Sequence, residues 1–142
     1  MSIQVMGAFQ ARSKVRRPLF LSAVQAGFPS PAEDYVDRKL DLNELCVRNP
    51  AATFFVRVAG ESMVEAGIND GDILVVDRSL EAKHGDVVIA VIDGELTVKR
   101  LEKRAGRFVL VPANSDFAVI ELDEGSDCEV WGVVRWSLHG VG

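Results

Sequence analysis

Ser62 and Lys99 are the two side chains of this sequence whose types and surroundings suit covalent catalysis. Ser62 lies in the segment Gly60-Glu61-Ser62-Met63, at the end of a predicted strand. A turn at such a place exposes a hydroxyl beside backbone N–H groups that can face a developing oxyanion. A serine becomes a nucleophile only when a neighbouring base takes its proton. An ordinary turn or helix-capping serine fits the same segment, so the assignment depends on the base.

Lys99 is the candidate base. It lies on the predicted strand 95–102, where alternation puts Thr97 and Lys99 on one face and Arg100 on the other, so one of the two cations must point inward. An ordinary lysine has a pKa near 10.4, which leaves roughly one in 2,500 neutral at pH 7, and burial can lower that pKa by up to about 3–5. A buried Lys99 could then take the Ser62 proton, with Thr97 placed to orient it. A surface lysine with a half-buried stem is the alternative.

The histidines and cysteines give weaker indications of a catalytic or metal site. His84 is a second candidate base, but His84-Gly85-Asp86 is typical of a turn, and His139 lies near the C-terminus. Cys46 and Cys128 are too few for a disulfide framework or a zinc cluster, and they indicate reduced thiols in a cytosol. The sequence therefore predicts no metal site and no cofactor.

A candidate substrate lies in the chain itself. The bond Ala26–Gly27 joins two small residues beside the extended, proline-bearing segment Phe28-Pro29-Ser30-Pro31, and small residues let a backbone approach a nucleophile closely. Basic residues, a short apolar run and Val24-Gln25-Ala26 also resemble a signal peptide. That run, residues 19–24, is shorter than the 7–15 residues that a signal peptide needs.

The elements that must position these side chains are predicted to be mainly β. Composition, at 48% hydrophobic and 26% charged over 142 residues, is that of a globular domain, and no apolar run reaches the roughly 20 residues of a membrane helix. Asp93-Gly94 predicts a tight hairpin turn. We expect a helical pattern over 32–47 with Asp41 as N-cap, and one helical turn over 63–66. Strands are predicted over residues 53–59, 73–77, 87–92, 95–102, 108–111, 119–122 and 128–137. This pattern predicts a compact, bent antiparallel β-sandwich or partly closed barrel with one or two short helices.

Charge divides the chain unevenly. Residues 1–27 hold four basic residues and no acidic one, whereas all 21 acidic residues lie in the rest, and the net charge is −5. The basic residues are Arg12, Lys14, Arg16 and Arg17. Since residues 1–17 show no clean period, we expect a flexible arm over 1–26, a linker with a short helix over 27–52 and a β body over 53–142. The negative net charge argues against binding duplex DNA through a basic face.

Several motifs together resemble the LexA/UmuD family of self-cleaving SOS proteins, in family order over about residues 20–136. UmuD-type members are the nearer likeness, because the residues before Gly27 are too few for the DNA-binding domain of a LexA repressor. UmuD-type members usually have Cys before the scissile glycine, and Ala26 is the LexA-like choice. The motifs are Ala26-Gly27-Phe28-Pro29-Ser30-Pro31, Gly60-Glu61-Ser62-Met63, residues 71–77, His84-Gly85-Asp86 and residues 93–101.

The resemblance implies a LexA- or signal-peptidase-like β fold in a cytoplasmic serine endopeptidase. Ser62 would be the nucleophile and Lys99 the general base, supported by Gly60, Met63 and Thr97, and the bond cut would be Ala26–Gly27. It implies stimulation by the RecA–single-stranded DNA filament. It also implies a homodimer, or a heterodimer of intact and cleaved forms, and a product that serves a UmuC-like, error-prone Y-family DNA polymerase in translesion synthesis and SOS mutagenesis.

Three alternatives stay open. The first is a non-catalytic dimeric module that binds the polymerase or RecA with an inert Ser62–Lys99 pair. The second, a repressor without its own DNA reader, is disfavoured by the missing helix-turn-helix. The third, a membrane-processing peptidase, is disfavoured by the missing membrane helix.

Overall fold

The computed structural model describes residues 2–8, 16–20, 36–122 and 128–142. The chain forms two compact units, one of residues 1–9 and 49–142 and the other of residues 10–48. The smaller unit contains β2 (Arg16–Phe20), β3 (Val36–Asp41) and α1 (Leu42–Cys46). The larger unit contains β1 (Ser2–Ala8), η2 (Pro50–Ala52), β4 (Thr53–Ala59), η3 (Val64–Ala66), β5 (Ile73–Asp77), β6 (Val87–Ile92), β7 (Glu95–Arg104), β8 (Arg107–Val111), β9 (Ile120–Glu121) and β10 (Cys128–Leu138).

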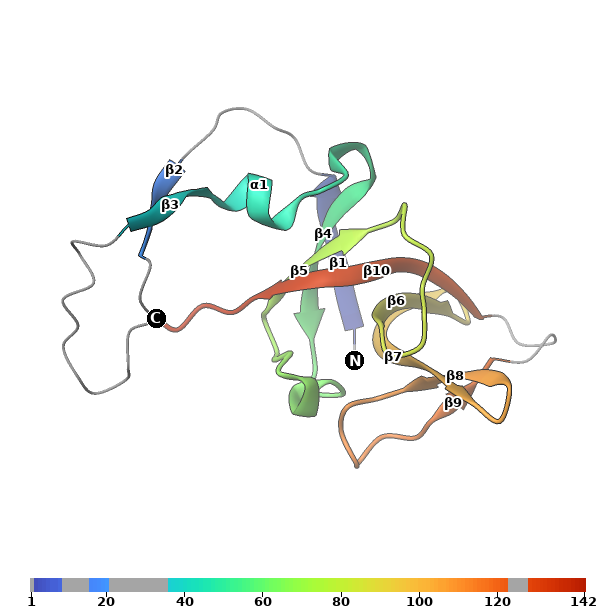
Figure 1. The fold of residues 1–142 in the computed structure, drawn as a ribbon. Coiled ribbons are helices and arrows are strands. Elements are labelled where there is room, and N and C mark those ends of the chain that lie inside the picture. The colour runs from blue at the N-terminus through green and yellow to red at the C-terminus, as the bar shows by residue number, and fades with distance from the viewer. Residues whose placement is uncertain (1, 9–15, 21–35, 123–127) are drawn as a thin grey trace. The chain divides into compact units, whose positions relative to one another are not determined.

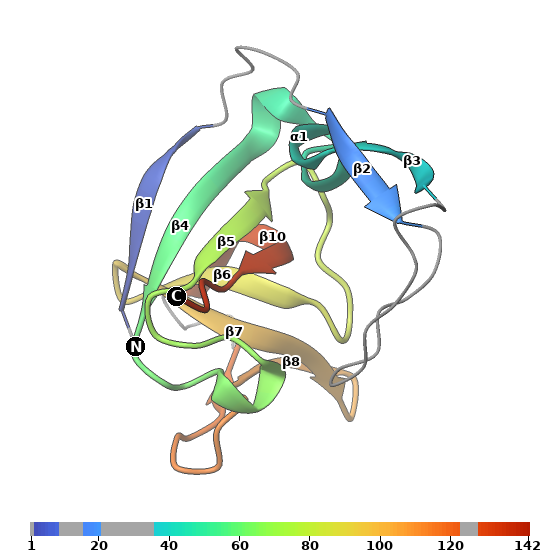
Figure 2. The same cartoon turned by 90° about the vertical axis from the view of Figure 1, so that its left-hand side faces the viewer.

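One antiparallel sheet of eight strands organises the larger unit, in the order β1-β4-β5-β10-β6-β7-β8-β9. The sheet coils, so that β1 also comes into contact with β7 (Figures 1 and 2). The prediction of a mainly β, antiparallel fold is confirmed. Among the described residues, no helix is long and apolar enough to cross a membrane.

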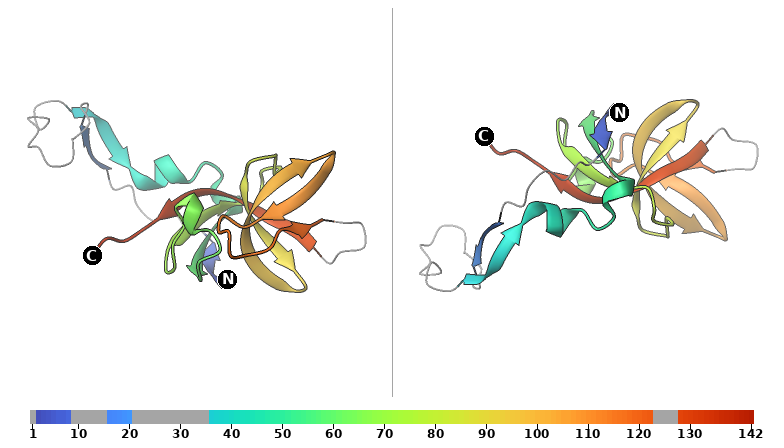
Figure 3. Two further views of the ribbon diagram at one scale, coloured as in Figure 1. Left: turned by 90° about the horizontal axis from the view of Figure 1, so that it is seen from below. Right: turned by 90° about the horizontal axis from the view of Figure 1, so that it is seen from above.

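β10 joins the two halves of this sheet. Its residues 128–133 pair with β6 and its residues 133–138 pair with β5, with an irregularity in each ladder (Figure 3). Gly132 lies next to Val133, where the two ladders meet, and a Cβ on Gly132 would stand only 2.6 Å from Val76 Cγ1. A side chain at this position would therefore force the buried Val76 side chain to shift, and glycine avoids that clash.

Turn chemistry explains the hairpins on either side of β7. Asp93 and Gly94 have φ of 51° and 80°, the two positive angles of the predicted tight turn between β6 and β7. Ala105 and Gly106 adopt a similar pair, 50° and 79°, between β7 and β8. The second turn was not predicted, because alanine is uncommon at positive φ.

Two clusters of aliphatic side chains form the core. The first includes Val56, Val58 and Met63, and the second is built on Leu101 and Leu110. The first cluster draws on β4, β5, β6 and β7, so its packing fixes these strands against the turn that follows β4. Ser62 lies in that turn.

Two predictions for the N-terminal third were wrong. Residues 2–8 form β1, an edge strand on β4, where an irregular arm was expected. Residues 36–41 form β3, paired with β2, and only 42–46 are helical, where a helical pattern was expected over 32–47. A helix this short has little stability of its own, so strand pairing decides the conformation of the residues before it.

The start of α1 was predicted correctly. Asp41 is its N-cap, and its carboxylate accepts a hydrogen bond of 2.8 Å from the N–H of Asn43. The predicted boundary between arm and linker at residues 26 and 27 lies outside the described residues, so the three-part division stays a prediction.

Candidate active site

Ser62 lies on a short connection between β4 and η3. β4 ends at Ala59, and Gly60 then takes a φ of 102°, which bends the chain in a way that favours glycine. The Gly60 N–H donates to Asp70 Oδ1 at 2.9 Å, which ties the bend to the turn before β5. The Ser62 side chain is fully buried, whereas the turn was expected to expose its hydroxyl.

Met63 anchors the same connection. Its side chain is fully buried in the first core cluster, and its carbonyl accepts hydrogen bonds from the N–H groups of Ala66 and Ile68. Gly67, with a φ of 80°, ends η3. The hydrophobic core therefore fixes the residue that follows Ser62. The family resemblance named Met63 as a supporting residue, but the sequence did not predict that it supports Ser62 by packing in the core.

Lys99 reaches Ser62 from β7. The two side chains are 37 residues apart in the chain, and Lys99 Nζ lies 3.2 Å from Ser62 Oγ, within hydrogen-bonding distance. Lys99 is 6% exposed and pairs with Val88 of β6. Arg100 turns the other way, where Nη1 donates to the Gly85 carbonyl at 2.7 Å. The prediction that one of Lys99 and Arg100 points inward is confirmed, and the inward residue is Lys99.

Burial sets the protonation of this amine. It disfavours the ammonium form and lowers the pKa of Lys99 from its ordinary value. Among the described residues, no carboxylate forms an ion pair with Lys99 to oppose that effect. More of the amine is therefore neutral at a given pH than in an ordinary lysine, and a neutral amine can accept a hydroxyl proton.

A loop 53 residues away braces the serine turn. Asn114 Nδ2 donates to the Glu61 carbonyl at 2.8 Å, and the Ala113 carbonyl accepts from the N–H of Glu65 at 2.8 Å. The Ala113 N–H points to Met63 Sδ at 3.2 Å. Sequence reasoning missed Asn114, because Pro112-Ala113-Asn114-Ser115 is typical of any turn and no spacing connects it to Ser62.

Two predicted participants have less support. Thr97 is buried beside Ala90 of β6, and the described hydrogen bonds include none between Thr97 and Lys99. Its orienting role stays a prediction. Ala26 and Gly27 lie outside the described residues, so the bond expected to be cut also stays a prediction.

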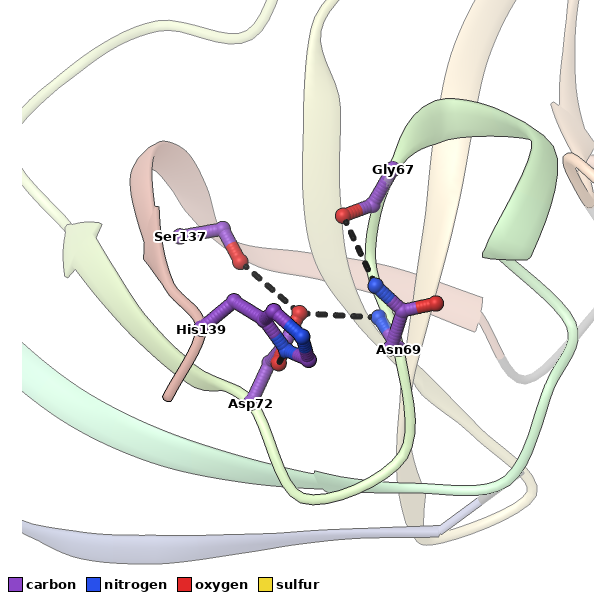
Figure 4. Close-up of polar contacts among 5 residues, drawn as sticks. All are labelled: Gly67, Asn69, Asp72, Ser137 and His139. Carbon is purple, nitrogen blue, oxygen red and sulfur yellow. Dashed lines mark hydrogen bonds and ion pairs between the residues drawn. The ribbon is translucent and has the colours of Figure 1, made fainter. Parts of the chain in front are cut away.

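Both histidines are engaged elsewhere. His84 Nδ1 accepts a hydrogen bond from the Lys103 N–H at 2.8 Å, which secures the loop before β6 to β7. His139 Nδ1 lies 2.6 Å from Asp72 Oδ1 (Figure 4). Lys99 is therefore the candidate base that lies beside Ser62.

Asp72 is the centre of a separate polar cluster. Its Oδ2 accepts from the Asn69 N–H at 2.8 Å and from Ser137 Oγ at 3.3 Å, while Oδ1 faces His139 (Figure 4). Burial raises the pKa of the Asp72 carboxyl, but the bonds from Asn69, His139 and Ser137 outweigh it and leave that pKa below its ordinary value. The cluster ties the end of β10 to the start of β5.

Comparison with known proteins identifies the family. The Peptidase S24-like family model matches residues 18–135. This chain belongs to that family. Over 122 residues it is 52% identical to the protein MucA of Salmonella typhimurium, which covers 85% of this chain and 83% of MucA. Over 136 residues it is 36% identical to the LexA repressor of Bordetella petrii, which covers 95% of this chain and 56% of the repressor.

A third relative is similar to this chain over nearly the same length. The protein SamA of Salmonella typhimurium is 48% identical over 122 residues, 86% of this chain and 84% of SamA. MucA and SamA are UmuD homologues of the LexA/UmuD family, so the resemblance drawn from the motifs is confirmed. Membership of a self-cleaving peptidase family and the LexA relative together support a serine peptidase with a part in the SOS response and mutagenesis.

Proposed function

We propose that this protein is a serine–lysine endopeptidase that hydrolyses its own Ala26–Gly27 bond. The observation that carries the proposal is the buried contact of 3.2 Å between Lys99 Nζ and Ser62 Oγ. The lowered pKa of Lys99 supports a neutral amine as general base, and the buried, braced turn supports a fixed hydroxyl. Family membership supports the reaction class.

The reaction has two halves. Lys99 takes the Ser62 hydroxyl proton while Oγ attacks the Ala26 carbonyl carbon, and the tetrahedral intermediate collapses as the bond to the Gly27 nitrogen breaks. The Lys99 ammonium gives its proton to that nitrogen, which leaves as a free amine. A water molecule then attacks the acyl-enzyme, Lys99 takes its proton, and Ala26 leaves as a carboxylate when Ser62 is reprotonated.

Tethering makes this reaction intramolecular or confined to a dimer. A tethered bond has a high effective concentration, so the rate depends on how often the segment is docked while Lys99 is neutral. An activator need supply no chemical group. We propose that the RecA–single-stranded DNA filament acts in this way by shifting the population toward the docked state.

The product of the reaction gives the protein its cellular role in this proposal. The shortened chain acts in the cytoplasm, as a homodimer or as a heterodimer with the intact form, and serves as accessory subunit of an error-prone Y-family polymerase during translesion synthesis. UmuD homology supports a part in SOS mutagenesis. No metal, cofactor or sequence-specific DNA contact enters the proposed reaction.

The test is a mass measurement on the purified full chain. Incubation at mildly alkaline pH, with and without RecA filament, is expected to remove residues 1–26. Ser62→Ala and Lys99→Ala should each retain the full mass. The matched controls are Ser115→Ala and Lys103→Ala, which change an exposed serine and an exposed lysine and should cleave normally. An intact parent chain in both conditions would contradict the proposal and favour a non-catalytic module.

A mixed sample separates the two routes of cleavage. Ser62→Ala protein with an intact Ala26–Gly27 bond is combined with an active protein whose own bond is blocked by substitution at Gly27. Cleaved product from the serine variant would establish cleavage between molecules, and its absence would place the reaction within one chain.

A further inference from the structure

The edge of the eight-stranded sheet at β1 connects the proposed cleavage to partner binding. β1 pairs with β4 from Ser2 opposite Ala59 to Ala8 opposite Phe54, with an irregularity between Val5 and Gly7. β4 has β5 on its other side, so β1 alone completes it within the sheet (Figures 1 and 2). Without β1, β4 would be the edge strand.

β1 lies on the N-terminal side of Ala26–Gly27. This inference rests on the proposed function, because a cut at that bond ends the covalent connection between β1 and β4. The released piece would also carry β2, which pairs with β3. Each ladder is short, with seven residues in β1 and five in β2.

Loss of the covalent connection weakens the pairing of β1 with β4. A tethered strand experiences an effective concentration on the order of millimolar, whereas a released fragment is held only at its real concentration. β1 is an edge strand with one ladder, to β4, so once the tether is cut, dilution favours its dissociation. The cut therefore changes β4 from a paired strand to an open edge.

Backbone geometry shows which groups the open edge would present. The Val58 N–H donates to the Asp72 carbonyl, and the Val58 carbonyl accepts from the Gly71 N–H, so Val58 bonds on the β5 side. Backbone groups alternate in direction along an antiparallel strand, so those of Arg57 and Ala59 face β1. Their N–H and C=O groups would become available to another strand.

Side chains determine which strand would fit the open edge of β4. Ile3 of β1 packs against the core cluster that holds Val56, Val58 and Met63. Its departure would leave an apolar position opposite Val58 without cover. Val5 is 38% exposed, so Ile3 is the more buried of these two β1 side chains. An incoming strand would need an aliphatic residue at the Ile3 position.

We propose that cleavage frees the β4 edge and that this edge then binds an extended segment of a partner protein by strand addition, with an aliphatic side chain in the place of Ile3. Main-chain hydrogen bonds to Arg57 and Ala59 supply the attachment, and the Ile3 position supplies the selectivity. The intact chain occupies its own edge with β1 and cannot bind that segment.

The test uses a cut that does not depend on Ser62. A recognition sequence for a site-specific protease is inserted between Ala26 and Gly27 of the Ser62→Ala chain, and the folded protein is cut with that protease. Failure of self-cleavage then cannot affect the result. The probe is a fluorescent peptide with the sequence of residues 2–8, and the control peptide carries Ile3→Asp.

Two readouts are expected to change together. After the cut and removal of the fragment, the amide hydrogens of Arg57 and Ala59 should exchange at least about tenfold faster, while that of Val58, bonded to Asp72, should not. The probe should bind the cut chain at least about tenfold more tightly than the intact chain, and the Ile3→Asp peptide at least about tenfold more weakly than the probe.

Three results would overturn the inference. One is unchanged exchange at Arg57 and Ala59 with the fragment absent. Another is equal binding of the probe to the cut and intact chains. The third is a cut chain that dimerises by itself and dissociates when the probe is added, because a second copy would then fill the edge. A cut chain with the same oligomeric state with and without the probe supports a partner protein.

Discussion

The Ser62–Lys99 pair and the Asp72–His139 pair are polar contacts within the larger unit. The fold disfavours the charged form of Lys99 and favours the charged form of Asp72. Lys99 and Asp72 are both almost fully buried, at 6% and 2% exposure, and the pKa of each is lowered. For Lys99 the lowered pKa means that the fold disfavours the charged form. For Asp72 it means that three hydrogen-bond partners favour the charged form despite burial.

The two shifts have different consequences for stability. Between the folded pKa of Lys99 and the ordinary lysine pKa of about 10.4, the unfolded chain holds more protons at Lys99 than the folded chain, so the destabilising effect of Lys99 shrinks as pH rises through its folded pKa. Asp72 contributes stability at neutral pH that is lost as pH falls from about 3.9 through its folded pKa. Burial of the Lys99 amine costs stability, and in the proposed function that cost maintains the general base, whereas Asp72 fastens β10 to β5.

The largest expected effect comes from Lys99→Arg, which keeps the charge and removes the ability to lose a proton. Self-cleavage at mildly alkaline pH should fall at least about 10³-fold, within the range that general-base catalysis supplies. The rate is followed by mass measurement, with Lys103→Arg as the matched control on β7. A rate within about tenfold of the parent would mean that Lys99 acts only as a charge.

Asp72→Asn tests whether the charged Asp72 carboxylate stabilises the fold. The variant loses a buried carboxylate that accepts from Asn69 and Ser137 and faces His139, so its free energy of unfolding at pH 7 should fall by about 2–4 kcal/mol. Urea denaturation measures the loss, and exposed Asp116→Asn serves as control. The difference from the parent should shrink as pH falls through the folded pKa of Asp72. An equal difference at every pH would contradict the charged role.

Lys99→Met should change the free energy of unfolding in the opposite direction to Asp72→Asn. Removing a buried cation without a described ion-pair partner should raise the free energy of unfolding at pH 7 by about 1–3 kcal/mol, while self-cleavage is lost. Since the parent gains stability as pH rises through the folded pKa of Lys99, the advantage of the variant should narrow above that pH. Urea titrations at several pH values check both parts, and a destabilised variant would show that Lys99 supports the fold.

Asn114→Asp has the smallest expected effect. The aspartate keeps the acceptor for the Asp116 N–H and loses the donor to the Glu61 carbonyl, so the loop retains its turn while the serine turn loses its brace. Self-cleavage should slow about tenfold, or about 1.4 kcal/mol in the barrier, with an unchanged urea midpoint. Ser115→Ala is the control. A normal rate would show that the other contacts of the serine turn position Ser62 without Asn114.

The central strands were predictable because their signals are local. Residues 53–59, 73–77 and 87–92 are strands with the predicted bounds, and Asp93-Gly94 forms the predicted turn. β1 was missed because an edge strand needs only one partner and need not show a regular apolar period. β3 was missed because the helical pattern around it competes with pairing to β2, a contact far along the chain.

The site was predictable in part for a similar reason. Alternation along β7 showed that either Lys99 or Arg100 must point inward, and the broken strand at Gly60 marked the serine turn. Neither signal could show that the two side chains lie in contact, because that contact depends on how β7 packs against the turn after β4. Asn114 and the Asp72 cluster depend on contacts between distant loops, for which the sequence carries no periodic signal.

Titration of the Lys99 amine tests most directly whether this lysine can serve as the general base for Ser62. NMR of the Ser62→Ala chain with 13C-labelled lysine side chains follows each ε-carbon as pH is raised, and Lys99→Arg assigns the resonance. Lys99 is expected to lose its proton at a clearly lower pH than an ordinary lysine does. If Lys99 titrated near the ordinary lysine value of about 10.4, the amine would be solvated and charged, and the proposed base would be absent.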